Sequence, residues 1–107
     1  MRTLVFDVDK QRIIKRRGCD FDSIVAGSSG YLKAKFNFLG TDWNGCKKAA
    51  SFWLDNNEYP MLLDADNSCV IPEEALTGAA FQVSVMGIRP NTDYKILTNK
   101  TKVKQEV

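Results

Sequence analysis

The sequence contains no histidine, and this absence removes the commonest general base and the commonest zinc ligand. It also has little net charge, +2 over 107 residues, whereas a nucleic-acid-binding domain shows a clear basic excess. No apolar run approaches the roughly 20 residues that a membrane-spanning helix needs. We therefore expect a protein that binds neither nucleic acid nor membrane and that does no histidine-dependent chemistry.

Cysteine is scarce and lacks a useful spacing. Cys19, Cys46 and Cys69 are odd in number and include no Cys-x-x-Cys pair, so they predict neither a disulfide framework nor a zinc site. We expect three free thiols. The segment from Met1 to Asp9 carries acids inside its apolar run, unlike a signal peptide, so we expect synthesis in a cytoplasm.

Candidate chemical motifs are also weak. The segment from Asp64 to Ser68 resembles the start of a calcium-binding loop, with side-chain oxygens at alternate positions. The sixth and twelfth positions of that loop should hold glycine and glutamate, but Cys69 and Ala75 stand there. A plain turn is the better interpretation, and no phosphate-binding loop is present. We expect no catalytic residue, no metal ligand and no cofactor, hence a protein that is not an enzyme.

The strongest pattern lies in the middle of the chain. From Tyr31 to Leu39 apolar and polar residues alternate, and the segment from Lys47 to Leu54 does the same. This period of two is typical of half-buried strands. The residues between them, Gly40 to Gly45, favour a turn. We expect the two segments to form a β-hairpin or a connected strand pair at the centre of a sheet.

Shorter segments extend the same pattern through the chain. Residues 19–30 predict mostly loop, with a possible short strand at Ser23–Ala26, and residues 72–78 predict a single helical turn. The last two strands are expected to pair with each other. The further predicted strands cover residues 3–8, 11–17, 58–64, 69–71, 79–87, 94–98 and 102–106.

Short strands separated by frequent turns are typical of an all-β sandwich or barrel. We predict a single domain over residues 1–107, an immunoglobulin-like β-sandwich of about 7–9 short antiparallel strands with one short helical turn. The inward positions of three strands carry a large aromatic residue, so we expect Phe36, Phe52 and Phe81 to share one core.

Two groups of residues are candidates for partner contacts. The basic segment near the N-terminus suits an acidic partner, or serves as a charged sheet edge that resists aggregation. Four aromatic residues are not obviously needed in the core, and they suit either an interface or the rims of the sheets: Tyr31, Trp43, Trp53 and Tyr59. The candidates are Arg12, Lys15, Arg16, Arg17, Trp43, Trp53 and Tyr59.

The combined motif series, over about residues 24 to 88, resembles small structural modules encoded by phages and prophages. The series is a Tyr-Leu start, two spaced aromatics, a Trp-x-Gly turn, Lys-x-Ala-x-Phe, Leu-Asp, Cys-x-Ile-Pro-x-Glu and Phe-x-Val-Ser-Val-x-Gly. It corresponds here to Tyr31-Leu32, Phe36, Phe38, Trp43, Gly45, Lys48, Ala50, Phe52, Leu63-Asp64, Cys69, Ile71-Pro72, Glu74, Phe81, Val83-Ser84-Val85 and Gly87.

The resemblance implies a non-enzymatic virion protein made in the host bacterial cytoplasm. It implies a docking, attachment or decoration module of the tail, baseplate or head surface, which binds other virion proteins as a homo-oligomer or in many copies. Because the sequence ends at Val107 without a fibre or receptor-binding extension, we expect a short attachment or connector protein. The alternative is a carbohydrate- or peptide-binding sandwich in host recognition, with the aromatic candidates stacked on glycan rings.

Overall fold

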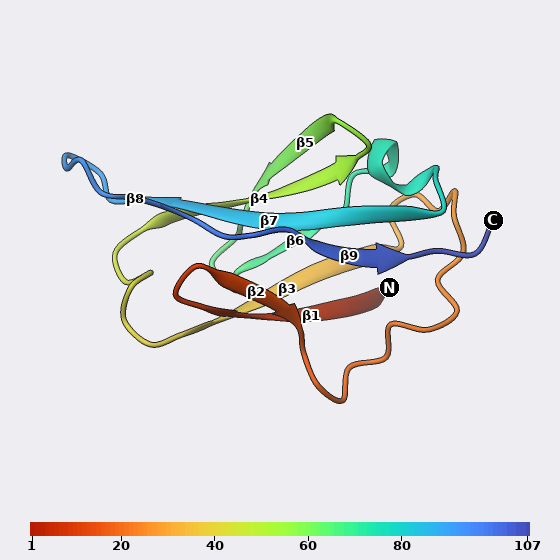
Figure 1. Ribbon diagram of the computed structural model, residues 1–107, viewed down its shortest axis with the longest axis horizontal. Helices are drawn as coiled ribbons and strands as arrows, with labels where there is room; N and C mark the ends of the chain where they lie inside the picture. The colour runs from red at the N-terminus through yellow and green to blue at the C-terminus, as the bar shows by residue number, and fades with distance from the viewer.

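A computed structural model describes all residues from 1 to 107 and shows two β-sheets packed face to face (Figure 1). Alternating burial along the strands follows the period of two in the sequence. The one helical element, η1, is a 3-10 turn at Glu73–Leu76, and no helix is long and apolar enough to cross a membrane. The strands are β1 (Arg2–Asp9), β2 (Arg12–Lys15), β3 (Leu32–Leu39), β4 (Lys47–Leu54), β5 (Asn57–Leu62), β6 (Ser68–Val70), β7 (Ala80–Ile88), β8 (Lys95–Leu97) and β9 (Thr101–Lys104).

The four-stranded sheet has the order β2-β1-β3-β6, and the five-stranded sheet has the order β5-β4-β7-β8 with β9 also paired to β7. The predicted all-β sandwich, its strand number and its single helical turn are confirmed, whereas the immunoglobulin-like topology stays a prediction. One pairing is not antiparallel: β1 and β3 run parallel, from Arg2 beside Leu32 to Asp9 beside Leu39. The long connection over residues 16–31 returns the chain to the end of the sheet where β1 begins, so β3 starts there too.

The predicted central hairpin is wrong. β3 belongs to the four-stranded sheet, whereas β4 pairs with β5 and β7 in the other sheet. Residues 40–46 therefore cross from one layer to the other instead of making a tight turn. The alternating pattern correctly assigned the faces of both strands, but a period of two does not say which strand lies next to which.

The C-terminal strands also pair differently from the prediction. β8 and β9 do not pair with each other, because both lie alongside β7. Residues 98–100, which connect β8 to β9, lie opposite residues 84 and 85 of β7. The C-terminal segment has one residue more than β7 there, and this residue forms a local bulge between β8 and β9. The short strand expected at Ser23–Ala26 is reduced to a single bridge between Val25 and Glu106.

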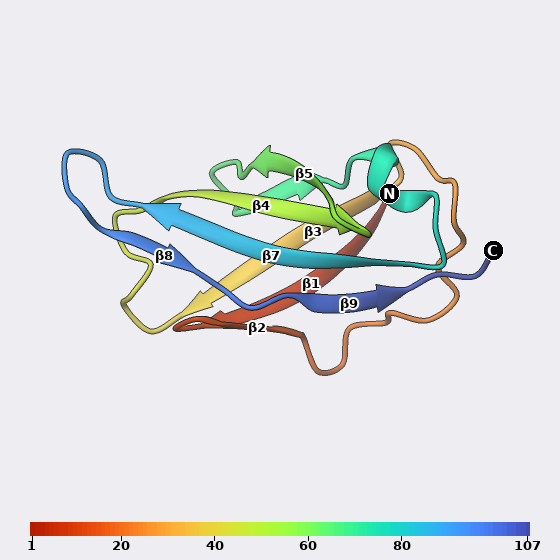
Figure 2. The same ribbon diagram turned by 45° about the horizontal axis from the view of Figure 1, so that its top comes forward.

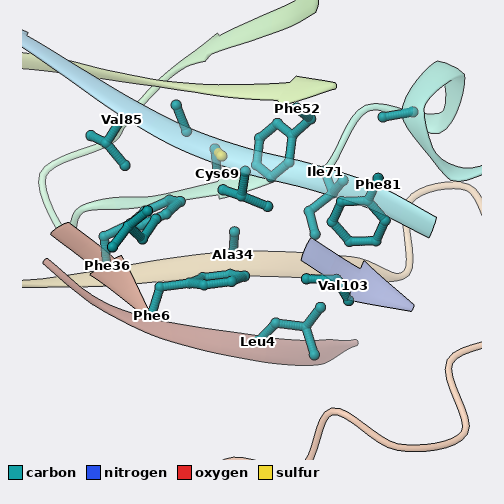
Figure 3. Packing of buried hydrophobic residues seen from close by; sticks show 14 of the residues in the cluster. Leu4, Phe6, Ala34, Phe36, Phe52, Cys69, Ile71, Phe81, Val85 and Val103 are labelled. Atoms are coloured by element: carbon teal, nitrogen blue, oxygen red, sulfur yellow. The ribbon is translucent and has the colours of Figure 1, made fainter. Parts of the chain in front are cut away.

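The core fills the space between the sheets and contains 20 buried residues. Phe6 and Phe36 stack at a centroid distance of 5.4 Å on the four-stranded side, and Phe52 lies 6.4 Å from Phe81 on the five-stranded side (Figure 3). The predicted sharing of one core by Phe36, Phe52 and Phe81 is confirmed. The three cysteines are free, as predicted.

The two chain ends lie near η1 at one end of the sandwich, and the loops after β3 and β7 lie at the other end (Figure 2). The long sides are formed by strands at the sheet edges. On one side β2 lies close to β9, and on the other side β5 lies close to β6. The edges are therefore the places where the backbone of this fold faces outward.

Candidate docking surface

Strand β2 forms an edge of the four-stranded sheet, as the sequence predicted for the basic segment. It turns back from β1 through Lys10, whose φ of 55° is in the left-handed region that a tight turn uses. Ile13 is buried and holds the strand on the core, while Arg12, Ile14 and Lys15 are exposed. One apolar anchor thus fixes a strand whose other side chains face solvent.

Only part of the outer edge of β2 has its backbone N–H and C=O groups hydrogen-bonded to another segment of the chain. The side-chain oxygen of Asn99 accepts a 2.8 Å hydrogen bond from the Ile13 N–H, and the Asn99 N–H donates to the carbonyl of Gln11. The Arg16 N–H bonds to Val5 on β1, so by the alternation of an antiparallel ladder the N–H and C=O of Lys15 point outward. Asn99 therefore does not close the edge at Lys15, and we call this the open part of the edge, beside which β9 of the other sheet lies.

The basic side chains of this segment have different roles. Arg16 forms a 3.0 Å ion pair with Asp7, and Asn37 also donates to that carboxylate. Arg12 and Arg17 take part in neither of the two ion pairs of the chain, and the Lys15 ammonium lies 5.6 Å from the centroid of the Phe21 ring. Arg16 is thus engaged within the fold. Lys15 and Arg17 lie at the open part of the edge, whereas Arg12 lies in the part that Asn99 closes, beside Asp9.

Trp43 is not an outward aromatic, and the expectation that the core does not need it is wrong. Its side chain is 1% exposed, and its indole N–H donates a 2.8 Å hydrogen bond to the carbonyl of Lys10. Its ring lies 5.0 Å from that of Phe38 and against Gly87 of the opposite sheet. Trp43 closes the end of the core beneath the crossover loop and is not available to a partner.

The other two aromatic candidates lie apart from β2. Trp53 faces outward on β4, where its indole N–H donates to Ser84 and the Lys100 ammonium lies 3.7 Å from its ring centroid. Tyr59 is half-buried on β5, packed against the core. The structure therefore brings the four basic candidates together on one segment and separates the three aromatic ones, which do not form one stacking surface.

Two observations bear on the chemistry that the side chains can do. No group of three or more Cys, Asp or Glu side chains is placed to hold a metal ion. Burial, and secondarily the charge of Asp64, raises the pKa of the Cys69 thiol from 9.0 to about 12, which keeps the thiol protonated and unreactive.

Comparison with known proteins finds a similar fold among solved structures. No protein-family model and no curated protein matches this sequence. A solved structure, the N-terminal domain of phage TP901-1 ORF48, has a similar fold. The TM-score is 0.61, the likeness covers 100% of both chains, and 10% of the residues are identical. At this level of identity the likeness concerns the architecture.

Sequence reasoning missed Asn99, which decides how much of the β2 edge is open. Its side chain bonds a residue 86 positions away in the sequence. An asparagine between two predicted strands indicated a turn residue with spare hydrogen-bonding groups. Its partner became visible only when β8 and β9 were placed alongside β7, which brings Asn99 to the neighbouring edge.

Proposed function

We propose that this protein is a non-enzymatic structural protein of a phage particle. It serves as a docking, attachment or decoration module of the tail, baseplate or head surface, in several copies per particle. Its partners are other structural proteins of the particle. The open β2 edge is the surface through which it attaches.

The observation that carries the proposal is the likeness of the whole chain, at a TM-score of 0.61, to a domain of a phage protein. This likeness shows a similar fold, and the phage function is inferred from it. It is supported by the phage-type motif series in the sequence, which was recognised on grounds other than shape. The surface supports it as well, because its features suit binding.

The β2 edge suits the addition of a strand from another chain. An extended segment pairs with the outward N–H and C=O of Lys15, and such main-chain pairing supplies affinity. The charges of Lys15 and Arg17 then favour an acidic segment and disfavour pairing between two copies of β2. Asn99 limits the contact to the C-terminal half of the strand, which sets its register.

The test is to purify particles from the source phage and to measure the copies of this chain by mass spectrometry. Lys15→Glu with Arg17→Glu is expected to reduce incorporation, because both charges then repel an acidic segment. The matched control, Lys33→Glu with Lys35→Glu, makes the same change in net charge two strands away on β3. Incorporation of this control should stay close to that of the unchanged protein.

Absence of the chain from purified particles overturns the proposal. Equal incorporation of both double variants shows that the β2 edge is not the attachment surface. Tight binding of glycans by the isolated protein, together with absence from particles, favours the carbohydrate-binding alternative instead. That alternative is weakened by the burial of Trp43 and by the position of Lys100 on the Trp53 ring.

A further inference from the structure

The outer face of the five-stranded sheet carries an apolar stripe. The strand registers place Leu62 beside Ala49, Ala49 beside Met86, and Met86 beside Leu97. These four residues form one row across β5, β4, β7 and β8, and Ile88 extends it along β7. We call these five residues the apolar stripe. Leu62 is 81% exposed, Leu97 48%, Ile88 44% and Met86 38%.

Basic side chains outnumber acidic ones around the stripe. Lys47 and Lys95 stand beside the stripe on β4 and β8, and Lys100, Lys102 and Lys104 lie further along the face. The carboxylates are fewer: Glu58 on β5, Asp64, which lines a hollow with Leu62 and Lys47, and Asp55, which lines another with Lys102. Glu58 accepts a hydrogen bond from Ser51 on the same face. An apolar centre with a polar rim is the anatomy of a protein interface, and here the rim is mainly basic.

The outer face of the four-stranded sheet is different. There Arg12, Arg16, Lys33 and Lys35 alternate with Asp7 and Asp9 across neighbouring strands. Its exposed apolar residues, among them Val70, do not form a row across the sheet. Opposite charges alternate on that face, whereas the five-stranded sheet carries more basic than acidic side chains around its apolar stripe.

The structure assigns the outer face of the five-stranded sheet to a contact with an acidic protein surface. A second copy of the chain in a symmetric contact would set the lysines of one face against the lysines of the other, and like charges disfavour that arrangement. A partner with carboxylates around an apolar centre matches both features. This assignment rests on the proposed function, because it takes the partner to be another structural protein of the particle.

Ser51 and Ser84 make the centre of the face low and flat. They lie opposite each other on β4 and β7, next to the pair formed by Ala49 and Met86. Trp53 bonds to Ser84 and is covered by Lys100, so the indole lies along the sheet. The face therefore suits a flat partner surface, and it is a second contact in addition to the strand edge at β2.

The experiment places a photo-crosslinking amino acid at Met86 and, as the matched control, at Val70 on the other outer face. The two side chains are equally accessible, 38% and 39% exposed. In particles that contain the chain, we expect Met86 to crosslink to a peptide of another virion protein with net negative charge, and Val70 to crosslink far less. Thermal unfolding of both variants checks that the fold is kept.

Substitution gives an independent readout of the same surface. Met86→Glu should lower the copies per particle about fivefold or more, as expected for a central interface residue, while Val70→Glu should change them less than about twofold. Three results overturn the assignment alone. They are equal crosslinking at both positions, no crosslink at Met86, and a crosslink from Met86 to a second copy, to its own chain or to a non-acidic peptide. Absence of the chain from particles overturns the proposed function and the assignment with it.

Discussion

At the scale of single residues, Trp43 shows how a side chain in a loop can complete a core. The crossover from β3 to β4 leaves the end of the sandwich open, and the indole fills that space between Phe38 and Gly87. Its hydrogen bond to Lys10 satisfies the buried N–H, which would otherwise be costly. Glycine at position 87 is required by this contact, since the ring occupies the place of a side chain.

Gly87→Ala is therefore expected to destabilise the protein. The added Cβ would lie 2.9 Å from two carbons of the Trp43 ring and 3.1 Å from the Cβ of Cys46. Overpacking of this kind costs about 1–3 kcal/mol, which urea unfolding can measure. Trp43→Phe in the same chain removes the clashing ring, so the double variant should cost less than the sum of the single ones. Simple additivity would contradict the contact.

Cys69 predicts a loss of stability at alkaline pH. Its pKa is raised from 9.0 to about 12 in the folded chain, mainly by burial. The unfolded chain releases this proton first, so the free energy of unfolding falls as the pH rises above 9.0 and is unaffected below it. Urea unfolding on both sides of that pH should show a steeper alkaline loss for the unchanged protein than for Cys69→Ala. Equal slopes would show that the thiol is not buried in solution.

At the scale of elements, the sequence predicted which residues face inward but not which strands are neighbours. Phe36 was correctly placed inward on β3, as were Phe52 on β4 and Phe81 on β7. The pairings of β3 with β4 and of β8 with β9 were wrong, because alternation is the same whether a strand continues its sheet or crosses to the other.

For the candidate docking surface, too, the sequence predicted the position of the strand but not its neighbours. The edge position of β2 was foreseen because a run of basic residues suits a charged sheet edge that resists aggregation. Its partial closure by Asn99 depends on contacts between distant segments and was not foreseen. The apolar stripe was equally hidden, because its members are ordinary outward residues until the registers align them in one row.

The open half of the β2 edge predicts opposite effects for two neighbouring proline substitutions. Lys15→Pro removes an N–H that points outward, so the fold should be kept, as edge strands tolerate such a proline. Ile14→Pro removes an N–H that faces Asp7 on β1 and should destabilise the sheet. Only Lys15→Pro should yield a folded chain that enters particles poorly. Unfolding curves and copy numbers in particles test this, and normal incorporation of Lys15→Pro would rule out strand addition at β2.

At the scale of the whole molecule, one core joins the two sheets. Phe6 and Phe36 come from the four-stranded sheet, Phe52 and Phe81 come from the five-stranded sheet, and all four belong to a single buried cluster. Neither sheet can keep its inner face dry without the other. The similarity in shape to a domain with 10% identical residues fits this picture, since the pattern of inward positions sets the architecture more than the identity of each residue.

A shared core predicts that the two sheets unfold together. Phe36→Ala on β3 and Phe52→Ala on β4 should each cost about 3–5 kcal/mol, because both leave a cavity in the same cluster. Each variant should show one unfolding transition, with the fluorescence of Trp43 and Trp53 and the far-ultraviolet circular dichroism changing at the same urea concentration. The hydrogen-exchange rates of the backbone amides in β3 and β4 should change together in each variant. If Phe36→Ala released only the four-stranded sheet while β4 and β7 stayed protected, the sheets would be independent units, and an interface on the five-stranded face would not need the other sheet at all.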